Sequence, residues 1–281
     1  MPADRLAIFR TSAALLVGMP GRFWSYRDLI VQMTLREVGQ RYRGTFLGML
    51  WSFLMPLLML IVYTVVFSAI LPSKWPGASA GDDLGEFALM LFAGLIPFTV
   101  FSEVIARAPL LILNVPNYVK RVVFPLEILP VVAIGSAVCN SLMAIVILLA
   151  GSVVFRGGIS PLIVLLPVMY VPLVLLCLGL AWFLAALGVY VRDVGHLVSF
   201  ILQMLIFLTP VFYPVTSVPR LKLIMHLNPL TAIIEGFRHV LLGSGEVPVT
   251  MWLMCIAGSA ALALLGYVFF MKTKSGFADV L

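Results

Sequence analysis

The sequence contains few of the residue patterns that carry out covalent chemistry. Residues 77–81 spell G-x-S-x-G, but that pattern marks a nucleophile only at a strand-to-helix turn, and here it follows Pro76 in a loop. No lysine follows a glycine, so the G-x-x-x-x-G-K-[ST] loop that binds ATP phosphates is absent. His196, His226 and His239 form no H-E-x-x-H motif, and no aspartates are spaced for a paired-carboxylate metal site. The sequence therefore predicts no catalytic centre, cofactor or metal site in this chain.

Charged residues beside apolar stretches are the next candidates, because burying a charge in a membrane costs about 3 kcal/mol or more. Glu103 and Arg107 are four positions apart, so they share one face of a helix and are predicted to form an ion pair. Glu127 follows Pro125 at the start of an apolar run. No series of carboxylates runs through the apolar stretches, so the pattern does not favour proton-coupled transport.

Aromatic residues make up 11% of the chain. Aromatic rings can stack on the apolar C–H faces of sugars, although aromatics in membrane helices more often pack against neighbours or lie at the interface. Both interpretations remain open for Trp182 and Phe183 and for the predicted channel-lining residues Trp51, Phe53, Phe98, Phe101, Phe207 and Phe212.

The elements that must position these residues are membrane helices. Of the 281 residues 62% are hydrophobic and only 11% are charged, which leaves a soluble domain too little polar surface to cover its core. The apolar runs are apolar on every face, which favours helices over the alternating strands of a barrel. We expect an all-α integral membrane protein with six spans, within residues 44–73, 87–102, 128–155, 157–191, 194–219 and 247–271.

The basic residues predict the orientation of these spans. With six spans, 13 of the 18 Lys and Arg residues fall on the side that holds both termini. The first loop on the other side is acidic at Asp82, Asp83 and Glu86. Because basic residues in short loops mark the cytoplasmic side, we expect both termini in the cytoplasm.

Three segments outside the spans have their own patterns. Residues 26–43 predict an amphipathic helix with two apolar stripes, either in contact with lipid and protein or lying on the head groups. Residues 107–125 predict an inner loop, and residues 221–227 and 230–242 predict either two re-entrant outer helices or a pair of surface helices. Gly44 and Gly48 form a G-x-x-x-G that could be a helix contact or a flexible entry. The predicted parts are a cytoplasmic segment (1–43), a six-helix domain (44–271) and a cytoplasmic tail (272–281).

Several motifs in a fixed order resemble one family. They are RYRGTFLGMLW at 41–51, NYVKRVVFPLEILP at 117–130, VRDV at 191–194, LTPVFYP at 208–214, NPL at 228–230, EGFR at 235–238 and FAD at 277–279. From about residue 26 to the C-terminus the chain resembles the membrane permease subunit of ABC-2 type polysaccharide exporters, the family that exports O-antigen, capsule and teichoic acid chains.

The resemblance implies a homodimer of permeases in the inner membrane, joined to two separate ATPase subunits that hold the ATP and magnesium. It implies a lipid-linked glycan as substrate and no nucleic-acid partner. It also implies that the inner loop couples to the ATPase and that short helices between the last two spans shape the outer mouth. On that basis the ATPase-coupling candidates are Asn117, Lys120, Arg121, Phe124, Arg192 and Asp193, and the outer-gate candidates are Tyr213, Asn228, Glu235 and Arg238.

Four arginines lie where the inner leaflet meets the first span: Arg27, Arg36, Arg41 and Arg43. Guanidinium groups bind the oxygens of a pyrophosphate in a forked geometry, which would suit the head group of the carrier lipid. The alternative is that these residues only fix the topology and attract anionic lipid.

Two other functions fit part of the pattern. An ABC-2 type exporter of another lipid or of a small molecule would have the same architecture without a glycan channel. A secondary transporter would need no ATPase and often has inverted repeats, which the sequence does not display beyond its hydropathy. A membrane enzyme is disfavoured by the lack of a clustered catalytic set.

Overall fold

The computed structural model describes residues 18–41, 43, 46–66, 83–120, 124–215, 225, 227–244 and 248–281, and within them the ordered elements are all helices. Residues 18–25 are helical and lead into α2. The helices are α2 (Arg27–Arg41), α3 (Trp51–Val65), α4 (Asp83–Arg107), α5 (Pro116–Lys120), α6 (Ile128–Arg156), α7 (Leu166–Tyr190), α8 (Val194–Leu208), α10 (Pro229–Leu242), α11 (Val249–Thr273) and α12 (Phe277–Val280). Short 3-10 turns precede or follow several of them, at Gly48–Leu50, Ala108–Leu110, Pro161–Leu165 and Lys274–Gly276.

Four of the described helical stretches are long and apolar enough to cross a membrane, namely Gly85–Leu110, Ile128–Arg156, Pro161–Tyr190 and Val249–Val280. They correspond to the predicted second, third, fourth and sixth spans, and the second runs past Glu103, as its short apolar run required. α3 and α8 have 15 residues each, or about 22 Å of helix. That is shorter than the hydrocarbon layer of about 30 Å, so the six-span arrangement is confirmed for four helices only.

α4 lies at the centre of the bundle. It packs against α3, α6, α7, α8 and α10, and every residue from 87 to 98 is buried. The other long helices expose much of their apolar surface, as expected for helices that face lipid. The residues of α4 are therefore held more firmly than those of any helix that has a free face.

The α7–α11 contact is the most extensive in the described structure, and its closest point is backbone against backbone. A Cβ atom added at Gly266 of α11 would overlap the carbonyl oxygen of Gly179 in α7. A Cβ at Gly179 would lie 2.5 Å from the carbonyl oxygen of Leu262. Small residues at such a contact allow membrane helices to approach closely.

Two predicted span boundaries are wrong, and both errors have a local cause. α8 ends at Leu208 rather than continuing towards residue 219, because Thr209 precedes Pro210 and is extended (φ −110°, ψ 148°). α6 ends at Gly157, which has φ 74° and caps the helix, so residues 157–160 belong to a loop and not to the fourth span. Pro210 thus ends a helix instead of kinking one.

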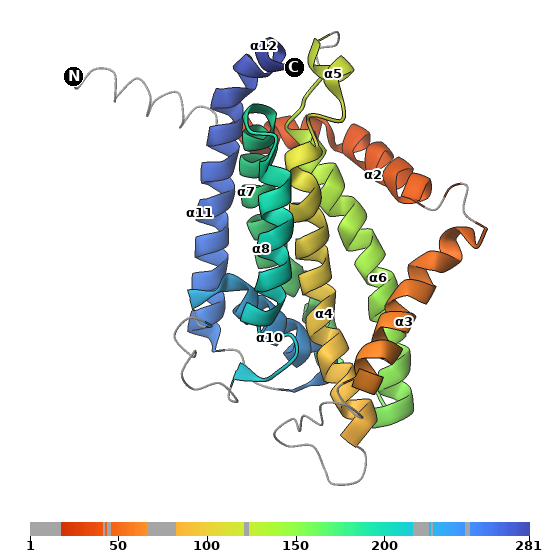
Figure 1. The fold of residues 1–281 in the computed structure, drawn as a ribbon. Coiled ribbons are helices and arrows are strands. Elements are labelled where there is room, and N and C mark those ends of the chain that lie inside the picture. Colours follow the sequence, from red (N-terminus) through yellow and green to blue (C-terminus); the bar gives the residue numbers. More distant parts are fainter. Residues whose placement is uncertain are drawn as a thin grey trace.

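The two ends of the bundle carry different elements. α2, α5 and α12 lie at one end, and α10 lies towards the other (Figure 1). The described part of the predicted inner loop after Leu110 contains only the short helix α5, whereas residues 107–110 still belong to the stretch Gly85–Leu110. α10 is almost wholly buried against α4, α7 and α11, which excludes a simple surface helix at residues 230–242. The residues 221–224 and 226 of its predicted partner helix lie outside the described residues.

Candidate functional site

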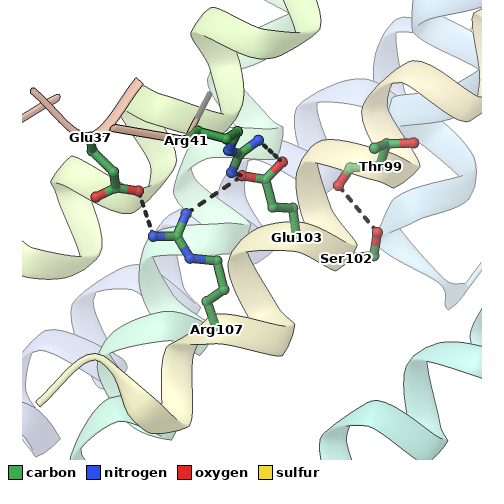
Figure 2. Close-up of polar contacts among 6 residues, drawn as sticks. All are labelled: Glu37, Arg41, Thr99, Ser102, Glu103 and Arg107. Atoms are coloured by element: carbon green, nitrogen blue, oxygen red, sulfur yellow. Dashed lines mark hydrogen bonds and ion pairs between the residues drawn. The ribbon is translucent and has the colours of Figure 1, made fainter. Parts of the chain in front are cut away.

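A cluster of four charged residues joins α2 to α4. α2 contributes Glu37 and Arg41, and α4 contributes Glu103 and Arg107. Each glutamate precedes its arginine by four positions, so each helix presents both charges on one face. Figure 2 shows that the two helices bring these faces together.

The main ion pairs run between the helices rather than along them. Arg41 donates from Nη1 to Oε2 of Glu103 at 3.1 Å and from Nη2 to Oε1, a forked contact. Arg107 Nη2 donates to Glu37 Oε1 at 2.5 Å. The predicted Glu103–Arg107 pair is confirmed at 3.6 Å between Oε1 and Nη1. Sequence reasoning missed Glu37, although the repeated E-x-x-x-R spacing in α2 and α4 was the signal for it.

The four side chains are only partly shielded from solvent, with exposed fractions between 20% and 36%. Their formal charges cancel, since two arginines face two carboxylates. Partly exposed ion pairs each contribute about 1 kcal/mol or less, so the cluster links α2, which packs mainly against α6, to α4 without locking it. A carboxylate bound in this way to an arginine can be replaced by another anion that accepts the same forked contact.

Directly beside the cluster, α3, α4 and α6 enclose a cavity of about 220 Å³. Arg41 and Glu103 line it, and most of its remaining wall is apolar, including Trp51, Met55 and Phe92. Asn140 contributes a buried amide nitrogen that has no hydrogen-bond partner among the described residues. An apolar cavity with a charged mouth is the shape expected for a lipid with an ionic head group.

A second, wider cavity of about 660 Å³ lies among α3, α4 and α8 and the turn after α8. Three predicted channel-lining residues, Phe98, Phe207 and Phe212, line it together with Gln203. The rings of Phe207 and Phe212 are 5.9 Å apart between centroids. The structure thus brings these three aromatic residues together.

The other predicted aromatic residues lie elsewhere. Phe53 is 41% exposed on α3, and Phe101 is buried in the core; neither lines either described cavity. Trp182 is fully buried and donates from Nε1 to the carbonyl of Glu127 at 3.0 Å. Phe183 packs against Phe269, with 5.0 Å between ring centroids. For Trp182 and Phe183 these contacts favour a packing role.

The four predicted head-group arginines have different surroundings. Arg41 lines the first cavity, and the lining residues described for that cavity include none of the other three. Arg27 lies 5.0 Å over the ring of Trp24 and 3.7 Å from Asp28. Arg36 and Arg43 are exposed at the surface. The geometry therefore favours Arg41 over the others as a ligand-binding arginine.

One of the predicted outer-gate residues is a buried arginine. Arg238 in α10 is 1% exposed and donates to the carbonyls of Met90 at 3.0 Å, Pro210 at 2.6 Å and Val211 at 2.6 Å. Glu235 accepts from Arg238 Nη1 at 3.0 Å. Arg238 therefore ties α10 to α4 and to the chain reversal after α8, and it supplies donors to non-helical backbone at that point.

The two remaining gate candidates stabilise local backbone. Asn228 caps α10, because its Oδ1 accepts from the Leu230 amide at 3.0 Å. Tyr213 donates from its hydroxyl to the carbonyl of Phe207 at 2.6 Å, across the end of α8. The gate role of all four residues stays a prediction.

Two of the predicted coupling residues lie on α5, which is at the same end of the bundle as α12 (Figure 1). Asn117 and Lys120 are exposed on α5, and Phe124 stacks on Tyr118 with 4.6 Å between ring centroids. Arg192 and Asp193 are exposed in the turn between α7 and α8. Arg121 lies outside the described residues. Such an exposed, polar end is available to a partner protein.

The long apolar helices packed around α4 are those of a multi-pass helical membrane protein. The chain belongs to the ABC-2 type transporter family, whose model matches residues 28–242. It is therefore a membrane transport component, as the sequence predicted.

Individual relatives give more detail. The chain is 28% identical over 228 residues to the O-antigen export system permease protein RfbA of Myxococcus xanthus, covering 80% of this chain and 84% of the relative. It is 24% identical to a protein of the same name from Klebsiella pneumoniae over 258 residues, 90% of this chain and 95% of the relative. It is 26% identical to the polysialic acid transport protein KpsM of Escherichia coli over 74% of this chain and 79% of the relative.

Proposed function

We propose that this chain is the permease subunit of an ABC exporter that moves a lipid-linked polysaccharide of the O-antigen type outward across the inner membrane. The observation that carries the proposal is the extent of the similarity to O-antigen export permeases, which reaches 90% of this chain and 95% of a relative. The relatives' names include two different polymers, O-antigen and polysialic acid. That range supports a glycan as the substrate class and does not single out one polysaccharide.

ATP bound with magnesium in a separate subunit drives the transport, because the sequence has no phosphate loop of its own. Two permeases and two ATPase subunits form the complex. The ATPase docks at the end that carries α5, where Asn117, Lys120, Arg192 and Asp193 are exposed. That end is cytoplasmic, in keeping with the basic residues of the N-terminal segment and the tail.

α3 and α8 complete a set of six crossings, with the 3-10 turn at Gly48–Leu50 lengthening the first. α10 then lies at the outer face as a re-entrant helix, covered by α4, α7 and α11. The apolar outer faces of α3 and α8, which include Met59, Val62 and Met204, are exposed in one copy. Two copies enclose the glycan channel between these faces, near the aromatic residues of the wider cavity.

The carrier lipid enters at the mouth of the smaller cavity. Its pyrophosphate replaces the carboxylate of Glu103 on the forked donors of Arg41, and apolar residues of α3, α4 and α6 contact the first part of its chain. Once Arg41 has released Glu103, only the Arg107–Glu37 pair of this cluster still links α2 to α4, so the exchange loosens α2 from α4. Binding of the head group thereby changes the position of the helix that leads into the first span.

The test is reconstitution of the chain with its ATPase subunit in liposomes that contain lipid-linked polysaccharide. We expect polymer to become accessible on the far side only with both subunits and ATP. Liposomes with the permease alone, and complexes with an ATPase unable to hydrolyse ATP, are the controls. ATP-driven movement by this chain alone, or movement of a free lipid or drug but of no glycan, would contradict the proposal.

A further inference from the structure

α5 is too short to hold its own orientation. It has five residues, and an isolated helix of fewer than about 12 residues is marginal in water. Its orientation therefore depends on its neighbours. Val115 and Val119 pack against a buried cluster that includes Phe277, and α12 contacts α5 directly.

The C-terminal residues are firmly attached to the bundle. Phe277 is fully buried, with its ring centroid 5.5 Å from that of Phe270 and 6.1 Å from that of Tyr190. The hydroxyl of Tyr190 donates to the carbonyl of Thr273 at 3.0 Å. Phe277 is therefore part of the folded core at this end, and Leu281 packs against the same cluster.

An ion pair connects the same segment to the far end of the inner loop. Lys274 Nζ lies 2.6 Å from Glu127 Oε2, and the Glu127 side chain is only 5% exposed. Glu127 immediately precedes α6, where the chain returns from the loop that contains α5. Removing Lys274 would leave the buried Glu127 carboxylate without an opposite charge, so breaking this ion pair should destabilise the fold.

We propose that the C-terminal segment Lys274–Leu281 positions α5 and, with α5, forms one docking face for the nucleotide-binding subunit. Phe277 supports α5 through the buried cluster against which Val119 packs, and Lys274 fixes the point at which the loop ends. Ala278, Asp279 and Val280 are exposed on α12, next to α5 and its exposed Lys120. The identity of the docking partner rests on the proposed function. The claim that the C-terminal segment positions α5 does not depend on it.

The decisive experiment is a charge swap in the assembled complex. In Lys274→Glu we expect the ATPase subunit to remain bound but polymer export per ATP hydrolysed to fall severalfold, because α5 is displaced. The double variant Lys274→Glu with Glu127→Lys restores the ion pair in reverse and should recover most of the coupling. Lys272→Glu, the same change at an exposed position two residues away, is the matched control and should leave coupling unchanged.

If the wild-type complex exports no polymer, that result contradicts the proposed function but not the position of α5. A second measurement then tests the position of α5 directly. Spin labels at Asn117 and Ala278 report the distance between α5 and α12 in the purified permease. We expect a narrow distance distribution in the wild type and the double swap, and a broad one in Lys274→Glu and Phe277→Ala. Unchanged distributions in both variants, or equal coupling in Lys274→Glu and Lys272→Glu, would overturn the inference.

Discussion

Arginines join helices at both ends of this molecule, but with different partners. Near α10, Arg238 is 1% exposed and bonds to three backbone carbonyls as well as to Glu235 of its own helix. At the other end, Arg41 and Arg107 are partly exposed and bond to two carboxylates. Backbone carbonyls cannot move without moving the helix or turn that carries them, whereas a carboxylate side chain can leave and be replaced. One arginine site is therefore a fixed support and the other can rearrange.

This difference matches the roles proposed for the two ends. The outer end holds a helix in place within the bundle, and the inner end must admit a lipid head group and transmit motion from the ATPase. Substitutions at Arg238 should therefore change stability, and substitutions around Arg41 should change ligand binding.

The largest effect is expected for Arg238→Met. Removing the guanidinium leaves buried carbonyls of Pro210 and Val211 without donors, which should lower the free energy of unfolding by about 3 kcal/mol or more. Thermal unfolding in detergent measures it, with Arg36→Met as the exposed control. Equal melting temperatures for the two variants would mean that Arg238 is not a support.

A smaller loss is expected for Gly94→Ala. The new Cβ would lie 2.7 Å from Nη2 of Arg238, which cannot shift without breaking its bonds to carbonyls. Overpacking of this kind costs about 1–3 kcal/mol. Gly258→Ala is the control, because among the described residues a Cβ at that position meets no heavy atom within 4 Å beyond its chain neighbours and its own helix backbone. If the Gly94→Ala cost persists in an Arg238→Met background, the clash is not with Arg238.

Glu103→Gln should change ligand binding more than stability. The exposed pair contributes about 1 kcal/mol or less, but its loss frees the forked donors of Arg41 for a pyrophosphate. We expect severalfold tighter binding of a polyprenyl pyrophosphate, measured by titration of the purified protein. Glu86→Gln, which breaks an ion pair with Arg156 instead, is the control. Weaker or unchanged binding in Glu103→Gln would contradict exchange at Arg41.

The smallest effect on folding is expected for Arg41→Lys. Lysine keeps the charge and the topology but cannot reproduce a forked contact, so polyprenyl pyrophosphate binding should weaken while membrane insertion stays unchanged. Arg36→Lys is the control on the same helix and should bind like the wild type. Equal binding by both variants would mean that these arginines fix the membrane topology and do not bind the head group.

Local patterns predicted the features that depend on one stretch of chain. The apolar run at 128–155 gave a helix within one residue of α6, Ile128–Arg156, because crossing a membrane requires a continuous apolar surface. The Glu103–Arg107 pair followed from helical spacing alone. The end of α8 at Leu208 could have been predicted from Pro210, because the residue before a proline rarely stays helical. The prediction extended the span instead, because the residues after Pro210 are also apolar.

The sequence by itself determined that this chain is a multi-pass helical membrane protein of the ABC-2 type, since hydropathy and ordered motifs are read along the chain. Only the tertiary structure decided which charges and glycines of different helices meet. Gly48 of the G-x-x-x-G pattern has an open surrounding and φ 52°, whereas Gly179 and Gly266, 87 positions apart, make the close backbone contact. Likewise Arg41 pairs with Glu103 across 62 positions. Such contacts depend on how helices are oriented and rotated against one another, which no single stretch of sequence specifies.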